Sequence, residues 1–182
     1  MKFIKSLINL PCIFALSVGL SFGLFFSETA EAGKNDKVKP DLFLEQSSED
    51  AAANLLEKAL IQAENGSWER IAVAQIHYLS GDKERGEEIF AGIKKKKAGD
   101  WIRMGRIYYR AGDWEKARAA FEQVVERAPK DEDWLAEIGA YYNLQGDRAK
   151  AEELFARSFK LDPDNLYNTL KAAGSYVGVV ER

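Results

Sequence analysis

The chain repeats itself at a spacing of 34 residues. Seven residues of one segment return in the next: Met104, Gly105, Tyr108, Gly112, Ala117, Phe121 and Pro129 correspond to Ile138, Gly139, Tyr142, Gly146, Ala151, Phe155 and Pro163. A weaker copy lies upstream at a spacing of 31, with Val73, Ala74, Gly81, Gly86, Phe90 and Ile93 in the matching places. Repeats of this length are single supersecondary units that bury their apolar faces against each other. The sequence therefore predicts a stack of similar units.

Each unit is expected to be a helical hairpin. Apolar residues recur at helical spacing from Glu49 onward, and short turns interrupt them at 65–67, 81–82, 99–100, 112–113 and 146–147. The last four turns are Gly-Asp pairs. The glycine of each pair suits the left-handed end of one helix, and the aspartate suits the start of the next. Ser47 and Ser48 can cap a first helix that begins at Glu49.

Small and aromatic residues occupy matching places in the copies. Gly105 and Gly139 are expected where the two helices of one hairpin approach closely, because larger side chains would force the helices apart. The aromatic residues supply apolar area between hairpins, about 1.5 to 3 kcal/mol for each buried side chain. Prolines stop the second helices. The aromatic and proline positions are Tyr108, Tyr142, Phe121, Phe155, Pro129 and Pro163.

The first 32 residues have the three parts of a signal peptide. Lys2 and Lys5 precede an apolar run over 7–26, and Ala30-Glu31-Ala32 offers a small-x-small cleavage site. The alternative is an uncleaved anchor, because about twenty apolar residues can span a bilayer. Both interpretations place the rest of the chain outside the cytoplasm: in the periplasm of a diderm bacterium or secreted elsewhere, or held at the inner membrane by residues 7–26. A linker over 33–47 would then lead to a folded domain over 48–182.

Charge and residue inventory argue against several functions. Lys and Arg number 26 against 29 Asp and Glu, a balance that offers no general attraction for nucleic acid. The single cysteine, Cys12, lies in the leader, and His77 is the single histidine. No phosphate-binding loop, dinucleotide-binding turn or His-Glu zinc motif is present in the sequence. We therefore expect no catalytic residues, metal, cofactor or small-molecule substrate.

Two stretches resemble tetratricopeptide repeats. WIRMGRIYYRAGDWEKARAAFEQVVERAP fills the usual places of that family with Trp101, Met104-Gly105, Tyr108, Gly112, Ala117, Phe121 and Pro129, and the stretch from Leu135 to Pro163 is a second match. The resemblance implies an all-α, right-handed superhelical solenoid with repeats at about 67–97, 98–131 and 132–165. Residues 166–180 resemble the first helix of one more repeat and would cap the stack.

The resemblance also implies a concave groove, lined by the first helices, that holds a peptide or helix of a partner protein. The groove positions carried over are Trp68, Ile71, Gln75, Tyr78, Ile102, Arg106, Tyr109, Arg110, Ala136, Ala140 and Asn143. Exposed aromatic and arginine side chains are the types that dominate binding energy at interfaces. Changing Trp68, Tyr78 and Tyr109 to alanine is expected to weaken partner capture without altering stability.

Two basic features have competing interpretations. Arg103, Arg106 and Arg110 form a stripe along one helix that suits a partner's carboxylates, or a solvated face paired with Glu115 or Asp133. The run Lys94 to Lys97 could attract acidic lipid or an acidic partner, or could complement the negative end of a helix. His77 occupies the place of Tyr108 and is expected to be a packed core residue.

The function expected from the sequence is that of a non-catalytic adaptor or scaffold of the cell envelope. The alternative is a self-assembling structural protein, a homo-oligomer in which the terminal helices complete a neighbouring chain's solenoid.

Overall fold

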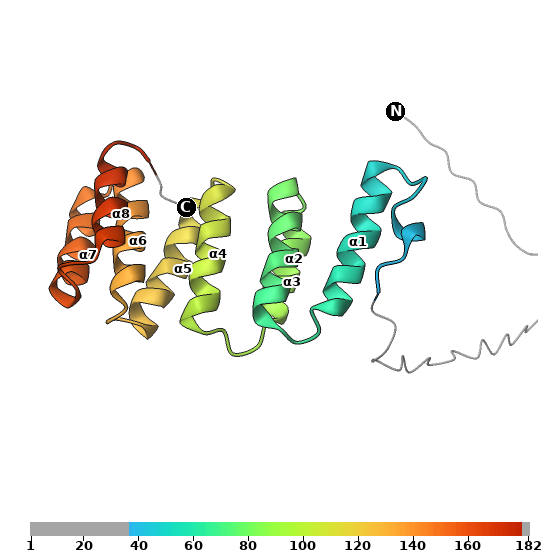
Figure 1. Ribbon diagram of the computed structural model, residues 1–182, viewed down its shortest axis with the longest axis horizontal. Coiled ribbons are helices and arrows are strands. Elements are labelled where there is room, and N and C mark those ends of the chain that lie inside the picture. Colours follow the sequence, from blue (N-terminus) through green and yellow to red (C-terminus); the bar gives the residue numbers. More distant parts are fainter. Residues whose placement is uncertain (1–36, 180–182) are drawn as a thin grey trace, which may run out of the picture. The chain divides into compact units, whose positions relative to one another are not determined.

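The computed structural model describes residues 37–179, which belong to one compact unit. The predicted signal peptide or anchor, and the first residues of the predicted linker, lie outside this range. Within it, every regular element is helical, which confirms the predicted fold class. A 3-10 helix, η1 (Pro40–Leu42), precedes α1 (Ser48–Gln62). The others are α2 (Ser67–Ser80), α3 (Lys83–Gly92), α4 (Ala98–Arg110), α5 (Trp114–Arg127), α6 (Glu132–Leu144), α7 (Arg148–Leu161) and α8 (Leu166–Tyr176) (Figure 1).

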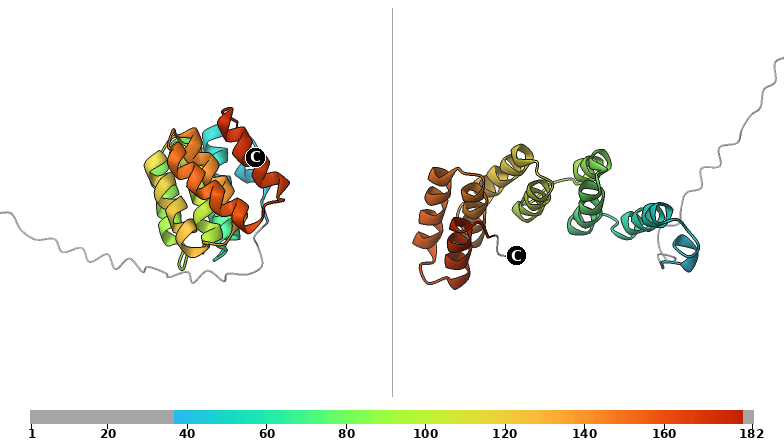
Figure 2. Two further views of the ribbon diagram at one scale, coloured as in Figure 1. Left: turned by 90° about the vertical axis from the view of Figure 1, so that its left-hand side faces the viewer. Right: turned by 90° about the horizontal axis from the view of Figure 1, so that it is seen from above.

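The helices pair as the repeat spacing predicts. Each of α2, α4 and α6 packs most extensively against the helix that follows it, α3, α5 and α7. We call α2, α4 and α6 the first helices. Helix α4 also packs on α2, and α1 lies against α2 (Figures 1 and 2). Helix α8 packs on α6 in the place of a further first helix. No helix among the described residues is long and apolar enough to cross a membrane.

Three of the four Gly-Asp turns have the predicted geometry. Gly81, Gly112 and Gly146 have φ of 105°, 73° and 87°, in the left-handed region that suits glycine. The aspartates that follow accept the backbone N–H of Arg85, Lys116 and Lys150. Ser47 caps α1 in the same way, by accepting the N–H of Asp50.

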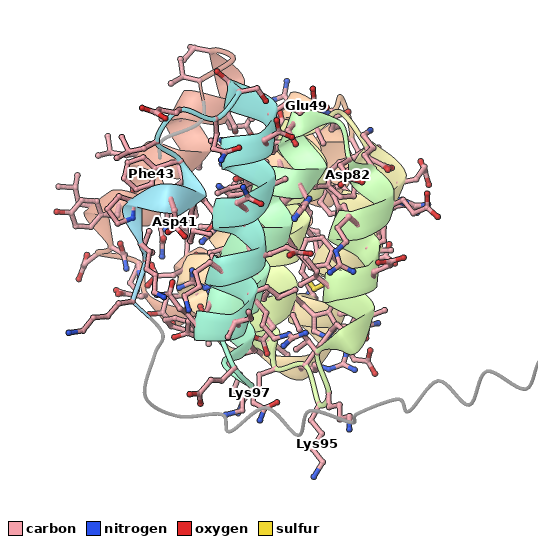
Figure 3. The ribbon with its side chains drawn as sticks, turned by 90° about the vertical axis from the view of Figure 1, so that its right-hand side faces the viewer. Asp41, Phe43, Glu49, Asp82, Lys95 and Lys97 are labelled. Atoms are coloured by element: carbon pink, nitrogen blue, oxygen red, sulfur yellow. The ribbon has the colours of Figure 1, made fainter. Side chains whose placement is uncertain are left out.

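The fourth pair, Gly99-Asp100, is not a turn, so that prediction is wrong. Helix α4 already begins at Ala98, and both residues lie in its first turn. The Asp100 carboxylate accepts the backbone N–H of Lys97 at 2.8 Å, reaching back to the residue that precedes the helix. The true turn lies upstream, where Lys95 has a φ of 54° (Figure 3).

The core consists of hairpin interiors joined by aromatic contacts. Phe121 and Phe155 lie directly over the glycines of their own hairpins, where a Cβ on Gly105 would collide with the Phe121 ring and one on Gly139 would lie 2.8 Å from Phe155. Tyr108 joins the first hairpin to the second, with its ring centroid 5.2 Å from that of Tyr78. Close packing within hairpins and wide aromatic contact between them are therefore both confirmed.

Candidate partner-binding surface

Five of the predicted groove residues lie in the core. Ile71, Tyr78, Ile102, Ala136 and Ala140 are at most 5% exposed. They lie on the sides of the first helices that pack within and between hairpins, so a partner cannot contact them. Tyr78 is the clearest case. It holds the same place in its repeat as Tyr109 does in the next, but Tyr109 is half-exposed whereas Tyr78 is buried against Tyr108. The expectation that these five residues line a surface is corrected accordingly.

Trp68 and Arg103 form the most exposed aromatic feature of the first helices. Trp68, at the start of α2, is 55% exposed. The guanidinium carbon of Arg103, on α4, lies 3.8 Å from the centre of the Trp68 ring, within cation–π range. This contact crosses from the first hairpin to the second. It places a cation over an aromatic ring at the surface.

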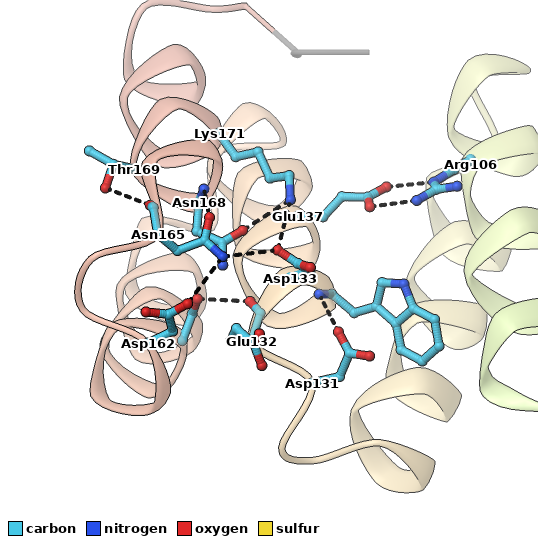
Figure 4. Close-up of polar contacts among 12 residues, drawn as sticks. Arg106, Asp131, Glu132, Asp133, Glu137, Asp162, Asn165, Asn168, Thr169 and Lys171 are labelled. Atoms are coloured by element: carbon cyan, nitrogen blue, oxygen red, sulfur yellow. Dashed lines mark hydrogen bonds and ion pairs between the residues drawn. The ribbon is translucent and has the colours of Figure 1, made fainter.

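Arg106 forms a two-pronged ion pair with Glu137 of α6. Its Nε and Nη2 atoms each donate to a carboxylate oxygen at 2.6 Å (Figure 4). The hydrogen bonds to Glu137 raise the pKa of Arg106, although partial burial opposes that rise. Glu137 is only 15% exposed in this pair. The predicted partners were different: Glu115 pairs with Arg118, and Asp133 pairs with Lys171, so those assignments are wrong.

The remaining surface positions differ in how far they are occupied by internal contacts. The Tyr109 ring packs against Tyr141, with centroids 4.5 Å apart. Asn143 donates to the Ser175 hydroxyl of α8 at 2.9 Å. Gln75 is half-buried. Arg110 is exposed, and within residues 37–179 no ion pair involves it or Arg103.

These contacts join α2, α4, α6 and α8 in sequence along one side of the hairpins. We call this side the first-helix face and define it by its solvent-accessible residues: Trp68, Arg103, Arg106, Tyr109, Arg110 and Asn143. Two of its cations have no carboxylate partner in the described chain, and one aromatic ring is largely exposed. Such a surface can bind carboxylates together with an apolar side chain.

A second polar cluster fastens the first hairpin to the second. The hydroxyl of Tyr78 donates to Asp113 and that of Tyr108 donates to Glu87, each at 3.0 Å, while Lys116 lies 2.7 Å from Glu87. Burial raises the pKa of both tyrosines, and the hydrogen bond to Glu87 raises the pKa of Lys116. These shifts favour the neutral phenols and the charged amine, the forms that make the cluster.

Among the other basic residues, Lys96 and His77 make internal contacts. Lys96 donates to the carbonyl of Ile93 at the end of α3, as expected of a cation near the negative end of a helix. Lys94, Lys95 and Lys97 are exposed, and Lys95 projects from the loop in Figure 3. His77 is half-buried and lies 3.0 Å from the carboxylate of Asp82. It is paired at the surface, so the expectation of a core position was wrong.

The described residues contain no cluster of metal-ligating side chains. A hollow of about 340 Å³ lies beside Trp101, lined mainly by apolar atoms of α4 and α5. Lys116 and Ala119 of α5 are among the residues that line this hollow.

Sequence reasoning missed Glu137 and the contact between Arg103 and Trp68. The charge stripe identified Arg103, but only the stacked hairpins bring it to Trp68, 35 positions earlier in the chain. Glu137 lies 31 residues after Arg106. That separation is close to one repeat length, so a search for opposite charges one repeat apart would have detected the pair.

This arrangement of hairpins is that of a repeat protein, and a family model supports the assignment: residues 102–165 match the family described as tetratricopeptide repeat. Among curated proteins, the chain is 26% identical over 149 residues to Superkiller protein 3 of Schizosaccharomyces pombe. That alignment covers 81% of this chain and 10% of the relative.

Two further relatives match a shorter stretch. Superkiller complex protein 3 of Homo sapiens is 29% identical over 73 residues, 40% of this chain and 5% of the relative. BBSome complex member BBS4 of Bos taurus is 33% identical over 75 residues, 41% of this chain and 14% of the relative. The chain therefore spans at most about a seventh of these proteins' length. The matches support a tetratricopeptide-repeat architecture for the described hairpins.

Proposed function

We propose that this protein is a non-catalytic adaptor that binds a segment of another protein along the first-helix face. The observation that carries the proposal is the exposed ring of Trp68 beside Arg103, together with Arg110 on the same helix as Arg103, since within residues 37–179 no carboxylate pairs with either of these two arginines. They lie seven residues apart on α4, about 10 Å along the helix axis. The partner segment would place an apolar side chain against Trp68 and carboxylates near the two guanidinium groups. The names of two relatives, a complex protein and a complex member, support a role in assembly.

The N-terminal leader supports a location outside the cytoplasm for this activity. Its basic start, apolar run and Ala-x-Ala site favour export with cleavage after Ala32, and the uncleaved anchor over 7–26 is the alternative. A role as an adaptor or scaffold of the cell envelope agrees with both the leader and the repeats. Either form would present the first-helix face outside the cytoplasm.

Affinity purification of the tagged chain from its own cells tests the proposal. The combined variant Trp68→Ala, Arg103→Ala, Arg110→Ala should lose the captured partner at least about tenfold. Helicity should be unchanged and stability should fall only slightly, because the lost contact between Trp68 and Arg103 is worth about 0.5 to 1 kcal/mol at the surface. Tyr78 and Arg106 are left intact. Removing the first would open the core, and removing the second would leave Glu137 without its cation.

A matched control changes two arginines on the second helices, Arg118→Ala and Arg148→Ala, which are at least 45% exposed. The control should retain the partner. Equal loss in both variants, or capture that survives the triple change, would show that the first-helix face is not the binding surface. The mass of the purified bait, measured in the same experiment, reports whether residues 1–32 have been removed. A bait that retains them contradicts cleavage.

A further inference from the structure

Large apolar side chains of the described chain are exposed mainly at its two ends, with four before Ser67 and seven after Lys160. Between Ser67 and Lys160, only Trp68 and Ile76 are large apolar side chains with high exposure. Seven more follow within 19 residues: Leu161, Leu166, Tyr167, Leu170, Tyr176, Val177 and Val179, exposed by 44 to 77%. A concentration of this kind marks an interaction surface on a folded protein.

Three exposed residues of α8 and its C-cap residue, Val177, form a regular seam. Leu166, Leu170, Ala173 and Val177 follow each other at spacings of four, three and four, the pattern by which one helix packs along another. They lie opposite the side of α8 that holds its buried residues, Asn168, Ala172 and Ser175. We call these four residues the α8 seam.

The repeat register shows why the seam is uncovered. Thirty-four residues earlier, Ala136 and Gly139 occupy the places of Leu170 and Ala173, and both are buried in α6. Phe155 of α7 lies over Gly139. No such helix covers α8 in the described residues, so a face with the pattern of a helix-packing surface remains at the end of the stack (Figure 2).

We propose that the α8 seam binds the α8 seam of a second copy of this chain, with the two helices antiparallel about a two-fold axis. Spacings of four, three and four read the same in both directions. An antiparallel copy therefore places Leu170 against Ala173 of its partner, and Leu166 against Val177. Each contact sets a large side chain against a smaller one, which lets the helices interdigitate.

The charge and size of the surface fit a second copy. The only charged residue on α8, Lys171, is directed inward and lies 3.6 Å from Asp133 and 3.0 Å from Asn168 (Figure 4). Two α8 helices therefore meet without opposing like charges of their own. Side chains of this kind bury on the order of 100 Å² each. The four residues of the α8 seam thus offer a few hundred Å² per copy, less than the roughly 800 Å² that each partner contributes to a standard interface, which fits a weak dimer in equilibrium with the monomer.

Light scattering of the full chain over a concentration series tests the pairing. We expect a monomer–dimer equilibrium that Leu170→Glu abolishes, with circular dichroism and melting unchanged because the side chain is 44% exposed. The matched control is Ile76→Glu, at 54% exposure on α2, which should leave the dimer intact. A monomer at every concentration, or a dimer that Leu170→Glu does not weaken, would overturn the proposal.

Disulfide trapping tests the antiparallel register in a Cys12→Ser background. A mixture of Leu170→Cys chains and Ala173→Cys chains should cross-link between the two kinds, several-fold faster than either kind with itself. Faster cross-linking of each variant with itself would contradict the register. Partner capture does not enter either measurement, so the pairing and the proposed adaptor function succeed or fail separately.

Discussion

At the scale of single residues, the two hairpin glycines show how closely paired helices approach. The Phe121 ring occupies the space beside Gly105 that a side chain would need, and Phe121 itself is fully buried. A methyl group at Gly105 would therefore collide with the Phe121 ring, and this buried ring cannot move aside into solvent. The position therefore depends on the absence of a side chain and not on backbone flexibility, since Gly105 lies within a helix.

Gly105→Ala should lower the free energy of unfolding by about 1 to 3 kcal/mol through overpacking against Phe121. The matched control is Gly99→Ala in the same helix, where a Cβ would meet only the Trp68 ring at 3.9 Å. The control should be neutral or more stable, because alanine favours helices. Urea unfolding of both variants measures the difference. Equal stabilities would mean that the Phe121 ring moves aside freely.

At the scale of secondary-structure elements, one N-cap does more than start a helix. Asp113 and Asp147 occupy the same place in successive repeats, and each accepts a backbone N–H in the first turn of its helix. Asp113 also accepts the hydroxyl of Tyr78 at 3.0 Å and lies 3.6 Å from Lys116. The start of α5 is therefore fastened to the preceding hairpin through Tyr78, which is only 1% exposed.

Asp147→Ala should cost about 1 kcal/mol, the usual value of an N-cap. Asp113→Ala should cost a further 1 to 3 kcal/mol or so, because it also leaves the buried Tyr78 hydroxyl without its acceptor. Thermal unfolding of both variants measures the difference. Combining Asp113→Ala with Tyr78→Phe should cost less than the sum of the single changes. Additive costs would show that the hydroxyl does not depend on Asp113.

The same elements show what the sequence could predict. Turns that end one helix and cap the next are local, so three Gly-Asp pairs were placed correctly from residue types alone. Gly99-Asp100 has the same two residue types, but the turn here lies earlier, at Lys95. Its position depends on the path of the chain between α3 and α4, which residue types alone do not determine. For the first-helix face, the sequence predicted which helices carry it. Which side chains reach solvent depends on how far neighbouring hairpins approach, as the burial of Tyr78 and Ile102 shows.

At the scale of the whole described chain, stability is distributed unevenly among the helices. Helix α1 contains no buried residue, whereas α6 buries more than half of its length. Because repeats support only their neighbours, the ends of such a stack open more readily than its middle. Helix α8 is better held than α1, because three of its side chains are buried and it packs extensively on α6.

Hydrogen exchange should reveal this order. We expect amides of α1 to exchange at least about tenfold faster than those of α6, because local opening of α1 exposes little apolar surface. Gly139→Ala should accelerate exchange in α6 and α7 and leave α1 unchanged. Uniform acceleration across all helices would show instead that residues 37–179 unfold as one cooperative unit.

The cluster at the first junction also bears on how a chain of this kind can change length during evolution. Tyr108, Asp113 and Lys116 recur one period later as Tyr142, Asp147 and Lys150. Loss of residues 98–131 would therefore bring the same three side chains to Tyr78 and Glu87, in the same order. The polar part of the junction would therefore survive the loss of a hairpin, whereas the contact with Trp68 would change, because Glu137 takes the place of Arg103 one period later.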